Sequence, residues 1–291
     1  MNFYIIGNGF DRHYGLNTAY EDFKDYLLKN GYDELVNNVD HFFMNHGEFS
    51  PDDINTWSSF EDMLESFNNL DSEEIYNEAM ANAETDDDRA SFWDSPSWNV
   101  TYYYEYIEVL KQQFAAWINE LDTHIDPDHY FKPQNDDFIL SFNYTTTIET
   151  NFSQMNLKLL HIHGTIGQEL ILGHNDYQNP DVFDMIEDEY SDYRDTTTKY
   201  AVNKLLENVA TLYFKNSEEI IQKYKTIFST IPLYDKVIFM GLRCGKQDAL
   251  YVHEILKHAS VVDFYYYRDD DLVRFESYAK KYPVNVNYIA W

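Results

Sequence analysis

The chain has 291 residues, and its 51 acidic and 21 basic side chains give a formal net charge of −30 at pH 7. A field of that sign repels phosphate backbones and anionic lipids, so we expect neither bulk nucleic acid nor a membrane as a partner. The length allows a substantial core, and 26 tyrosines and 20 phenylalanines mean that the low mean hydropathy does not indicate disorder. A single cysteine, Cys244, excludes an intramolecular disulfide and a thiolate zinc cluster. Because no segment resembles a signal peptide or a membrane span, we expect a cytoplasmic protein.

The segment 2–20 has the pattern of a strand, a tight turn and a helix. Its apolar run 3–6 is too short for a helix and is typical of a strand buried on both faces of a parallel sheet. Gly7 and Gly9 then allow a tight turn, which we expect to leave backbone N–H groups uncovered. If a helix begins soon afterwards, its positive end makes a seat for a phosphate. The spacing does not match the dinucleotide fingerprint GxGxxG, so an ordinary strand-to-helix turn is the alternative.

A helical insertion is predicted after this first strand and helix. Thr18 and Glu21 have the spacing of a capping box at a helix start, and Gly31 is expected to end that helix. From 31 to 128 the sequence is acidic, rich in asparagine and aromatic residues, and helical in period. We therefore assign 31–128 to an insertion between the first and second strands.

Further helices are expected within the insertion. Ser58 and Glu61 have capping-box spacing, another helix is expected after Asp71, and the strongest helical period covers 103–121. The tract 84–94 has the composition of a solvated loop. The apolar stripes of these helices are Trp57, Phe60, Leu64 and Phe67 in the first, and Ile107, Leu110, Phe114, Trp117 and Leu121 in the last.

The rest of the chain alternates short apolar runs with helical segments, which is typical of a parallel sheet with helices on both faces. The acidic stretch 176–200 is expected to be a mobile lid over the site or a disordered loop. The predicted fold class is α/β, with a mostly parallel Rossmann-like sheet in a nucleotide-binding domain made of 1–30 and 129–291. Its expected later strands are 138–142, 159–162, 170–172, 237–240, 261–267 and, as an edge strand, 284–289.

Polar blocks follow several of these strands, at the edge where open α/β sheets bind ligands. Asn143 lies in the block 141–145, and its amide is an uncharged donor and acceptor suited to holding a ribose hydroxyl or a water. Capping of a helix that begins near Thr147 is its alternative role.

Two further blocks carry groups that are able to do chemistry. His161 and His163 are two apart on an expected strand, so we expect both imidazoles on one face, where histidine is suited to moving a proton near neutral pH. A histidine satisfied inside the fold is the alternative, and it suits one of them better than both. Gly241 permits the close approach of a ligand, and Arg243 is able to pair with a phosphate or with one of the many carboxylates.

Several of these blocks resemble the successive motifs of the AbiH family of bacteriophage abortive-infection proteins. They are GNGFDRHYGLNTAYEDFKDYL, WSSFEDML, LSFNYTTTIE, HIHG, LILGHN and IFMGLRCGKQDALYVHEI, in that order along the chain. The GNGFD and GL portions of the first block are also similar to the first nucleotide loop of sirtuin-like folds. The resemblance therefore implies a sirtuin-like NAD-binding fold and a role in antiphage defence.

The resemblance also implies roles for individual residues. Asn143 and His163 fall on the catalytic positions of the sirtuin-like class, although Thr145 replaces an acidic residue of that class. The residues implied to bind NAD are Gly7, Asn8 and Gly9 around the pyrophosphate, Asn143 and Thr145 at the nicotinamide ribose, Gly241 and Arg243 near the adenosine, and Asp11 and His161 beside them. Because the thiolate zinc site of deacylating sirtuins is absent from the sequence, protein deacylation is not expected, and no metal is assigned.

These observations lead to three functional hypotheses. The first is an antiphage effector that binds NAD and hydrolyses its nicotinamide–ribose bond, with a phage-derived trigger, a protein partner or a second copy of the chain as further partners. The second is a non-catalytic module that binds a nucleotide or a partner. The third is metal-dependent phosphoester hydrolysis, because His161, His163, His174 and Asp176 resemble a ligand set. The sequence leaves the roles of His174 and Glu61 open.

Overall fold

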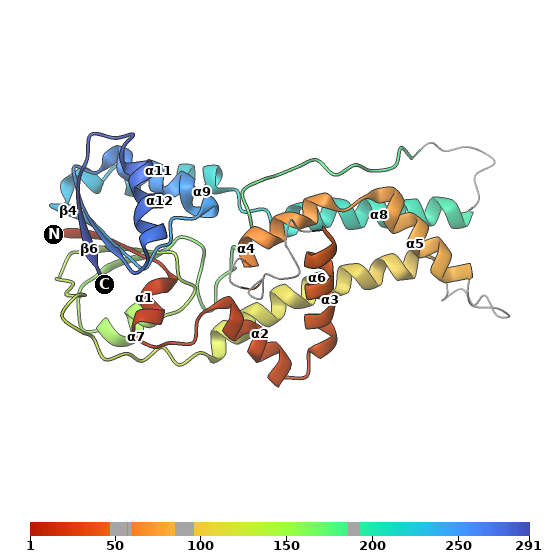
Figure 1. Ribbon diagram of the computed structural model, residues 1–291, viewed down its shortest axis with the longest axis horizontal. Helices are drawn as coiled ribbons and strands as arrows, with labels where there is room; N and C mark the ends of the chain where they lie inside the picture. The colour runs from red at the N-terminus through yellow and green to blue at the C-terminus, as the bar shows by residue number, and fades with distance from the viewer. Residues whose placement is uncertain (47–56, 58–59, 85–95, 186–192) are drawn as a thin grey trace. The chain divides into compact units, whose positions relative to one another are not determined.

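The computed structural model describes residues 1–46, 57, 60–84, 96–185 and 193–291. The chain divides into two compact units (Figure 1), which we call the sheet unit and the helical unit. The sheet unit consists of 1–23, 115–171 and 216–291, and the helical unit consists of 24–114 and 172–215. Each unit is therefore built from segments that are far apart in the sequence.

The sheet unit contains a six-stranded sheet in which every neighbouring pair is parallel. The strand order is β3-β2-β1-β4-β5-β6, so the order along the sheet reverses between β1 and β4. This order and the parallel pairing confirm the predicted α/β, Rossmann-like fold class. The strands are β1 (Asn2–Ile6), β2 (Phe138–Ser141), β3 (Lys158–His161), β4 (Lys236–Met240), β5 (Val261–Tyr266) and β6 (Asn285–Ala290).

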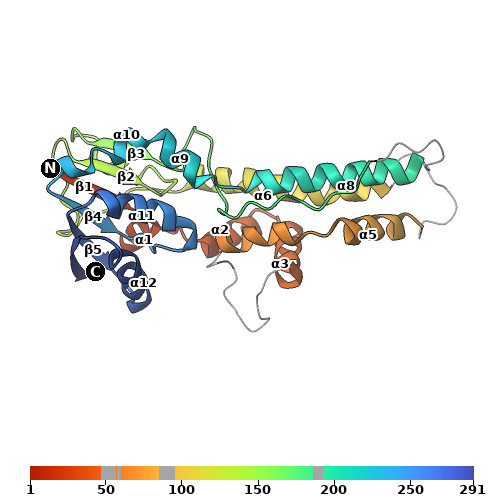
Figure 2. The ribbon, with the colours of Figure 1, turned by 90° about the horizontal axis from the view of Figure 1, so that it is seen from above.

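Successive residues of a strand point to opposite faces of the sheet. Both faces of this sheet are apolar, and helices cover both of them. Phe3 and Ile5 of β1 belong to the larger hydrophobic cluster, which includes residues of the later helices. Tyr4 and Ile6 belong to the second cluster, with Phe10. Figure 2 shows these strands and helices from a second direction. The larger cluster is covered by α9 (Ser217–Lys223), α10 (Lys225–Phe228), η3 (Ile231–Leu233), α11 (Ala249–His258) and α12 (Asp269–Ala279), and the second by α1 (Asn8–His13) and α7 (Thr147–Phe152).

The helical unit contains 24–114, which overlaps most of the expected insertion 31–128, and a second segment, 172–215. Its elements are α3 (Asp33–His46), α4 (Phe60–Met63), η2 (Leu64–Asn69), α5 (Ser72–Glu84) and α8 (Tyr193–Leu212), while α2 (Tyr20–Lys29) and α6 (Pro96–Glu120) cross the unit boundary. Its core is aromatic, with Phe67 stacked on Tyr213 and on Phe42. No helix in the described part of the chain is both long enough and apolar enough to span a bilayer.

The helix predictions are confirmed in position, with one correction at a helix start. Gly31 has a positive φ of 79° just after α2, as expected for a helix end. The start of α2 is not the predicted capping box, because Asp22 rather than Glu21 accepts the backbone N–H, that of Ala19, at 2.8 Å. The hydroxyl of Thr18 is buried and has no hydrogen-bond partner among the described residues.

The predicted helices of the insertion also form. The apolar stripe from Trp57 to Phe67 is buried, α5 follows Asp71, and α6 covers most of 103–121. Ser58 and the expected loop 84–94, apart from Glu84, lie outside the described residues.

Two predictions for the second half of the chain are wrong. The expected strand 170–172 is a loop, in which Ile171 donates its N–H to the carbonyl of His163 at 2.9 Å. The expected lid or loop 176–200 is helical from Tyr193, because α8 packs against α5. The segment 172–215 therefore belongs to the helical unit, whereas the sequence assigned all of 129–291 to the nucleotide-binding domain.

Candidate functional site

The loops after β1 and β4 meet where the strand order reverses. A Cβ atom on Gly9 would lie 2.8 Å from Cα of Gly241, and one on Gly7 would lie 2.6 Å from Cα of Leu242. Gly241 has a φ of 74°, and a Cβ there would lie 2.0 Å from the nitrogen of Phe10. Close approach at Gly241 was predicted for a ligand, but in the structure it is the approach of one backbone loop to another.

This contact engages the N–H groups of the first turn. Gly7 donates to the carbonyl of Met240 at 3.0 Å, Gly9 to that of Gly241 at 2.8 Å, and Phe10 to that of Gly7 at 2.8 Å. The expectation that the turn leaves these N–H groups uncovered is therefore wrong. The side chain of Asn8 donates to the carbonyl of Thr18 at 2.7 Å, which fixes the loop that follows α1.

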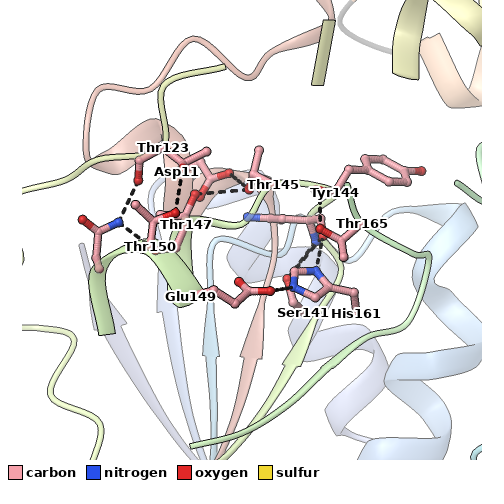
Figure 3. A network of polar contacts seen from close by, with 12 residues as sticks. Asp11, Thr123, Ser141, Tyr144, Thr145, Thr147, Glu149, Thr150, His161 and Thr165 are labelled. Carbon is pink, nitrogen blue, oxygen red and sulfur yellow. Dashed lines mark hydrogen bonds and ion pairs between the residues drawn. The ribbon is translucent and has the colours of Figure 1, made fainter. Parts of the chain in front are cut away.

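Asp11 is the most deeply buried acid beside this turn, with no exposed surface. Its Oδ2 accepts a hydrogen bond from the hydroxyl of Thr145 at 2.6 Å, and that hydroxyl accepts one from Thr147 at 3.2 Å. Figure 3 shows this chain of polar contacts. Burial raises the pKa of Asp11 to about 6, against the hydrogen bonds from Thr145, Thr147 and Asn143, which lower the pKa. The acid is therefore set to gain or lose a proton near neutral pH.

Asn143 lies in the loop between β2 and α7 and is also buried. Its backbone is fixed on both sides, because its N–H donates to Ser141 at 3.2 Å and its carbonyl accepts from the ring of His161 at 2.8 Å. Its side-chain amide lies close enough to Asp11 to lower the pKa of that acid. Its Oδ1 is buried and has no hydrogen-bond partner among the described residues.

His161, at the end of β3, is placed between two hydrogen-bond acceptors. Nδ1 lies 2.8 Å from the carbonyl of Asn143, and Nε2 lies 2.9 Å from the carboxylate of Glu149. Burial by itself lowers the pKa of His161, but hydrogen bonds to Glu149 and Asn143 and the charges of Glu149 and Asp11 together hold it above its ordinary value. Because both ring nitrogens lie beside acceptors, these surroundings favour the doubly protonated ring over the neutral one.

His163 has different surroundings from His161. Its ring packs edge-on against Phe142 at 5.3 Å and near Tyr251 at 5.4 Å, and both of these belong to the larger hydrophobic cluster. The two imidazoles therefore do not share a face, contrary to the prediction from the sequence. The reason is that β3 ends at His161, so the alternation of strand side chains does not extend to His163.

Arg243 and Thr145 have partners of their own. Arg243 is exposed in the loop after β4, its carbonyl accepts from Arg274 at 3.1 Å, and its charge acts on Asp271. Burial raises the pKa of Asp271, and the charge of Arg243 opposes that rise. The hydroxyl of Thr145, which the resemblance implies at a ribose, donates a hydrogen bond to Oδ2 of Asp11.

The proposed metal ligands are not brought together among the described residues, where no three histidine, cysteine or acidic side chains are grouped to hold an ion. His174 and Asp176 belong to the helical unit, whereas His161 and His163 belong to the sheet unit. Glu61 lies 3.6 Å from the ammonium of Lys215 within the helical unit.

Two residues of this network were missed in the sequence. Glu149 holds His161, and Thr147 orients Thr145, yet neither follows a strand directly. The sequence gives one indication of these two residues, which is that both lie in the first turn of the helix that follows the Asn143 block.

Comparison with models of protein families identifies the family of this chain. The model of the family described as "Bacteriophage abortive infection AbiH" matches residues 3–267, far more than half of the chain. Comparisons with the curated proteins and with the solved structures gave no match. The chain therefore belongs to the AbiH family of bacteriophage abortive-infection proteins.

Proposed function

We propose that this protein acts in abortive infection by binding NAD at the carboxyl edge of its sheet and hydrolysing the nicotinamide–ribose bond. The family match supports the abortive-infection role. The strand order supports a nucleotide at this edge, because open α/β sheets bind ligands where the order reverses. The proposal rests on two buried oxygens, Oδ1 of Asp11 and Oδ1 of Asn143, which have no hydrogen-bond donor among the described residues.

Both oxygens are suited to a ligand that carries hydrogen-bond donors. An ionised carboxylate and an amide oxygen accept hydrogen bonds and donate none. A buried acceptor left without a donor costs about 1–3 kcal/mol, and a ligand hydroxyl removes that cost. Each ribose of NAD presents adjacent hydroxyl groups, which suits two neighbouring acceptors.

The proposed reaction needs few groups from the protein. The bond between ribose C1′ and the nicotinamide nitrogen breaks, and its electron pair leaves with nicotinamide. Asn143 holds the ribose while a water oxygen bonds to C1′, and His163 accepts the proton that the water loses. The products are nicotinamide, ADP-ribose and a proton.

Nicotinamide release from NAD tests this function. Protein purified from phage-infected cells is incubated with NAD, and nicotinamide is measured by chromatography. Asn143→Ala and His163→Ala should each lower release by at least 100-fold. Asn119→Ala and His124→Ala change exposed residues of the sheet unit and serve as matched controls. Absence of release by the unaltered protein, or equal release by His163→Ala, refutes the proposal.

A non-catalytic nucleotide-binding role is favoured by one observation, the aromatic surroundings of His163. A ring packed between Phe142 and Tyr251 has a structural role available to it without any proton transfer. In that case calorimetry should show NAD binding with no nicotinamide released. Gly9→Val should abolish the binding, because its side chain would displace the loop at Gly241.

A further inference from the structure

We infer that His161 is a positioning residue of the candidate site: its ring joins the carbonyl of Asn143 to the carboxylate of Glu149, and so fixes the backbone from which the Asn143 amide projects. The identity of the molecule that meets this amide rests on the proposed function. The placement of the amide by His161 does not, because it depends on contacts within the protein.

The loop between β2 and α7 is held by side chains from the end of β3 and the segment after it. Nδ1 of His161 lies 2.8 Å from the carbonyl of Asn143. The hydroxyl of Thr165 donates to the carbonyl of Tyr144, also at 2.8 Å. Figure 3 shows both of these side chains. His161 reaches the loop because it pairs with Ser141, so that β2 and β3 end side by side.

The direction of each hydrogen bond of the ring follows from the chemistry of its partner. A backbone carbonyl carries no proton, so Nδ1 of His161 donates to Asn143. Nε2 lies 2.9 Å from Oε1 of Glu149, and an ionised carboxylate likewise only accepts. Glu149 lies in the first turn of α7, the helix that follows the loop. The ring therefore ties the start of the loop to the helix at its end.

The backbone of Asn143 is held on both sides of its Cα atom. Its N–H donates to Ser141 at 3.2 Å, and its carbonyl accepts from His161. Because each peptide group is planar, fixing the groups before and after a Cα atom also fixes the direction of the Cα–Cβ bond between them. The amide then projects from a fixed point, and its Oδ1 is buried with no hydrogen-bond donor among the described residues. His161 therefore acts on a ligand through Asn143.

Two amide variants separate the two contacts of the ring. The amide nitrogen of asparagine is as many bonds from Cα as Nδ1 of histidine, so His161→Asn keeps a donor for the carbonyl of Asn143 and loses the contact with Glu149. The amide nitrogen of glutamine corresponds in the same way to Nε2, so His161→Gln keeps a donor for Glu149 and loses the contact with Asn143. Positioning through the carbonyl predicts that His161→Asn is the milder change, whereas a ring that only pairs with Glu149 predicts the opposite order.

Nuclear magnetic resonance reports the Asn143 carbonyl directly. The protein is labelled with ¹³C at the carbonyl of asparagine and with ¹⁵N in tyrosine, and each amide is correlated with the carbonyl before it. Only Asn–Tyr pairs then give a signal, and in this sequence they are Asn143–Tyr144 and Asn287–Tyr288. Asn287 lies in β6 and supplies an internal reference. We expect the Asn143 signal to move further in His161→Gln than in His161→Asn, while the Asn287 signal stays in place.

Nicotinamide release is the second readout. We expect His161→Gln to lower the turnover number by about 100-fold, as a small misplacement of a catalytic group does, and His161→Asn to recover about tenfold of that loss. His258→Gln is the matched control, because Nε2 of His258 also lies beside a glutamate, 3.1 Å from Oε1 of Glu254, but on α11. This control should leave both readouts unchanged.

The outcomes separate the two proposals. An Asn143 signal that stays in place in His161→Gln, or that moves equally in the two His161 variants, overturns the positioning role. If His161→Gln does not fold, Glu149→Ala changes a side chain that is 41% exposed and should also move the signal, and a signal that stays in place there overturns the role. Signals that move as expected in a protein that never releases nicotinamide support the positioning role and refute NAD hydrolysis. Release at an unchanged rate in His161→Gln refutes the positioning role and leaves hydrolysis supported.

Discussion

The contact between the loops after β1 and β4 predicts a large cost for a single methyl group at Gly241. Two separate effects act there. The φ of 74° is unfavourable for alanine and costs about 1–2 kcal/mol. The added Cβ would also lie 2.0 Å from the nitrogen of Phe10 and 2.5 Å from the carbonyl carbon of Gly9, so backbone atoms have to move. We expect Gly241→Ala to lower the free energy of unfolding of the sheet unit by about 3–6 kcal/mol.

Two other glycines separate these effects. Gly167 has a φ of 78° with nothing within 4 Å of an added Cβ, so Gly167→Ala carries the conformational cost by itself, about 1–2 kcal/mol. Gly9 lies in α1 without a positive φ, and its Cβ would meet Gly241 at 2.8 Å. Gly9→Ala therefore carries the steric cost by itself, about 1–3 kcal/mol.

Urea denaturation of the three variants measures these differences, and hydrogen exchange in peptides from β1 and β4 locates them. Because Gly9 and Gly241 are in contact, the double variant should cost less than the sum of the single ones. The reasoning is refuted if Gly241→Ala falls within 1 kcal/mol of Gly167→Ala, or if Gly9→Ala does not increase exchange in β4.

The other predictions concern buried charges. Because the pKa of Asp11 is raised by burial to about 6, its contribution to stability is greatest at low pH and is lost as pH rises through that value. Urea denaturation should therefore show that Asp11→Asn gains about 1.4 kcal/mol over the unaltered protein between pH 5 and pH 8, and no change with pH contradicts this. The pKa of His161 is raised above its ordinary value, so the protonated ring contributes stability at pH values below the ordinary pKa of histidine, and this contribution is lost at higher pH. Glu149→Gln should therefore lower the free energy of unfolding more at pH 6 than at pH 9. It should also lower the pKa of His161 in a histidine titration. In the helical unit, Glu61→Gln removes the charge of the carboxylate that lies 3.6 Å from the ammonium of the buried Lys215. It should destabilise by about 3 kcal/mol, more than Lys215→Met; the opposite order in thermal unfolding would argue against a role for the ion pair.

The sheet was predictable because its signals are local. The strands β1, β2, β4 and β5 are each a short apolar run with turn residues beside it. The alternation of apolar and polar residues in 284–289 identified β6 as an edge strand. The assignment of 172–215 to the helical unit was not predictable, because it depends on packing of α8 against α5, which precedes it by about a hundred residues.

The candidate site was predictable in part for the same reason. Asn143 was found because it lies two residues after the end of β2, and Asp11 because it lies in the first block. The partnership of His161 with Glu149 depends on the orientation of α7, which no spacing reveals. His163 was misplaced because β3 ends at His161, so the alternation of strand side chains does not fix the side to which His163 points.

The central position of β1 has a consequence for the order in which a ribosome makes this protein. Asn2 pairs with Lys236, so the first strand waits for a neighbour that is synthesised 234 residues later. At about 5–20 residues per second, that delay is roughly 10–50 s. The junction of Gly9 with Gly241 therefore cannot form before residue 241 has been synthesised, and a nascent chain that has not reached β4 lacks the candidate site. Chains stalled before β4 should pair β1 with β2 on one side and leave the other edge of β1 unpaired.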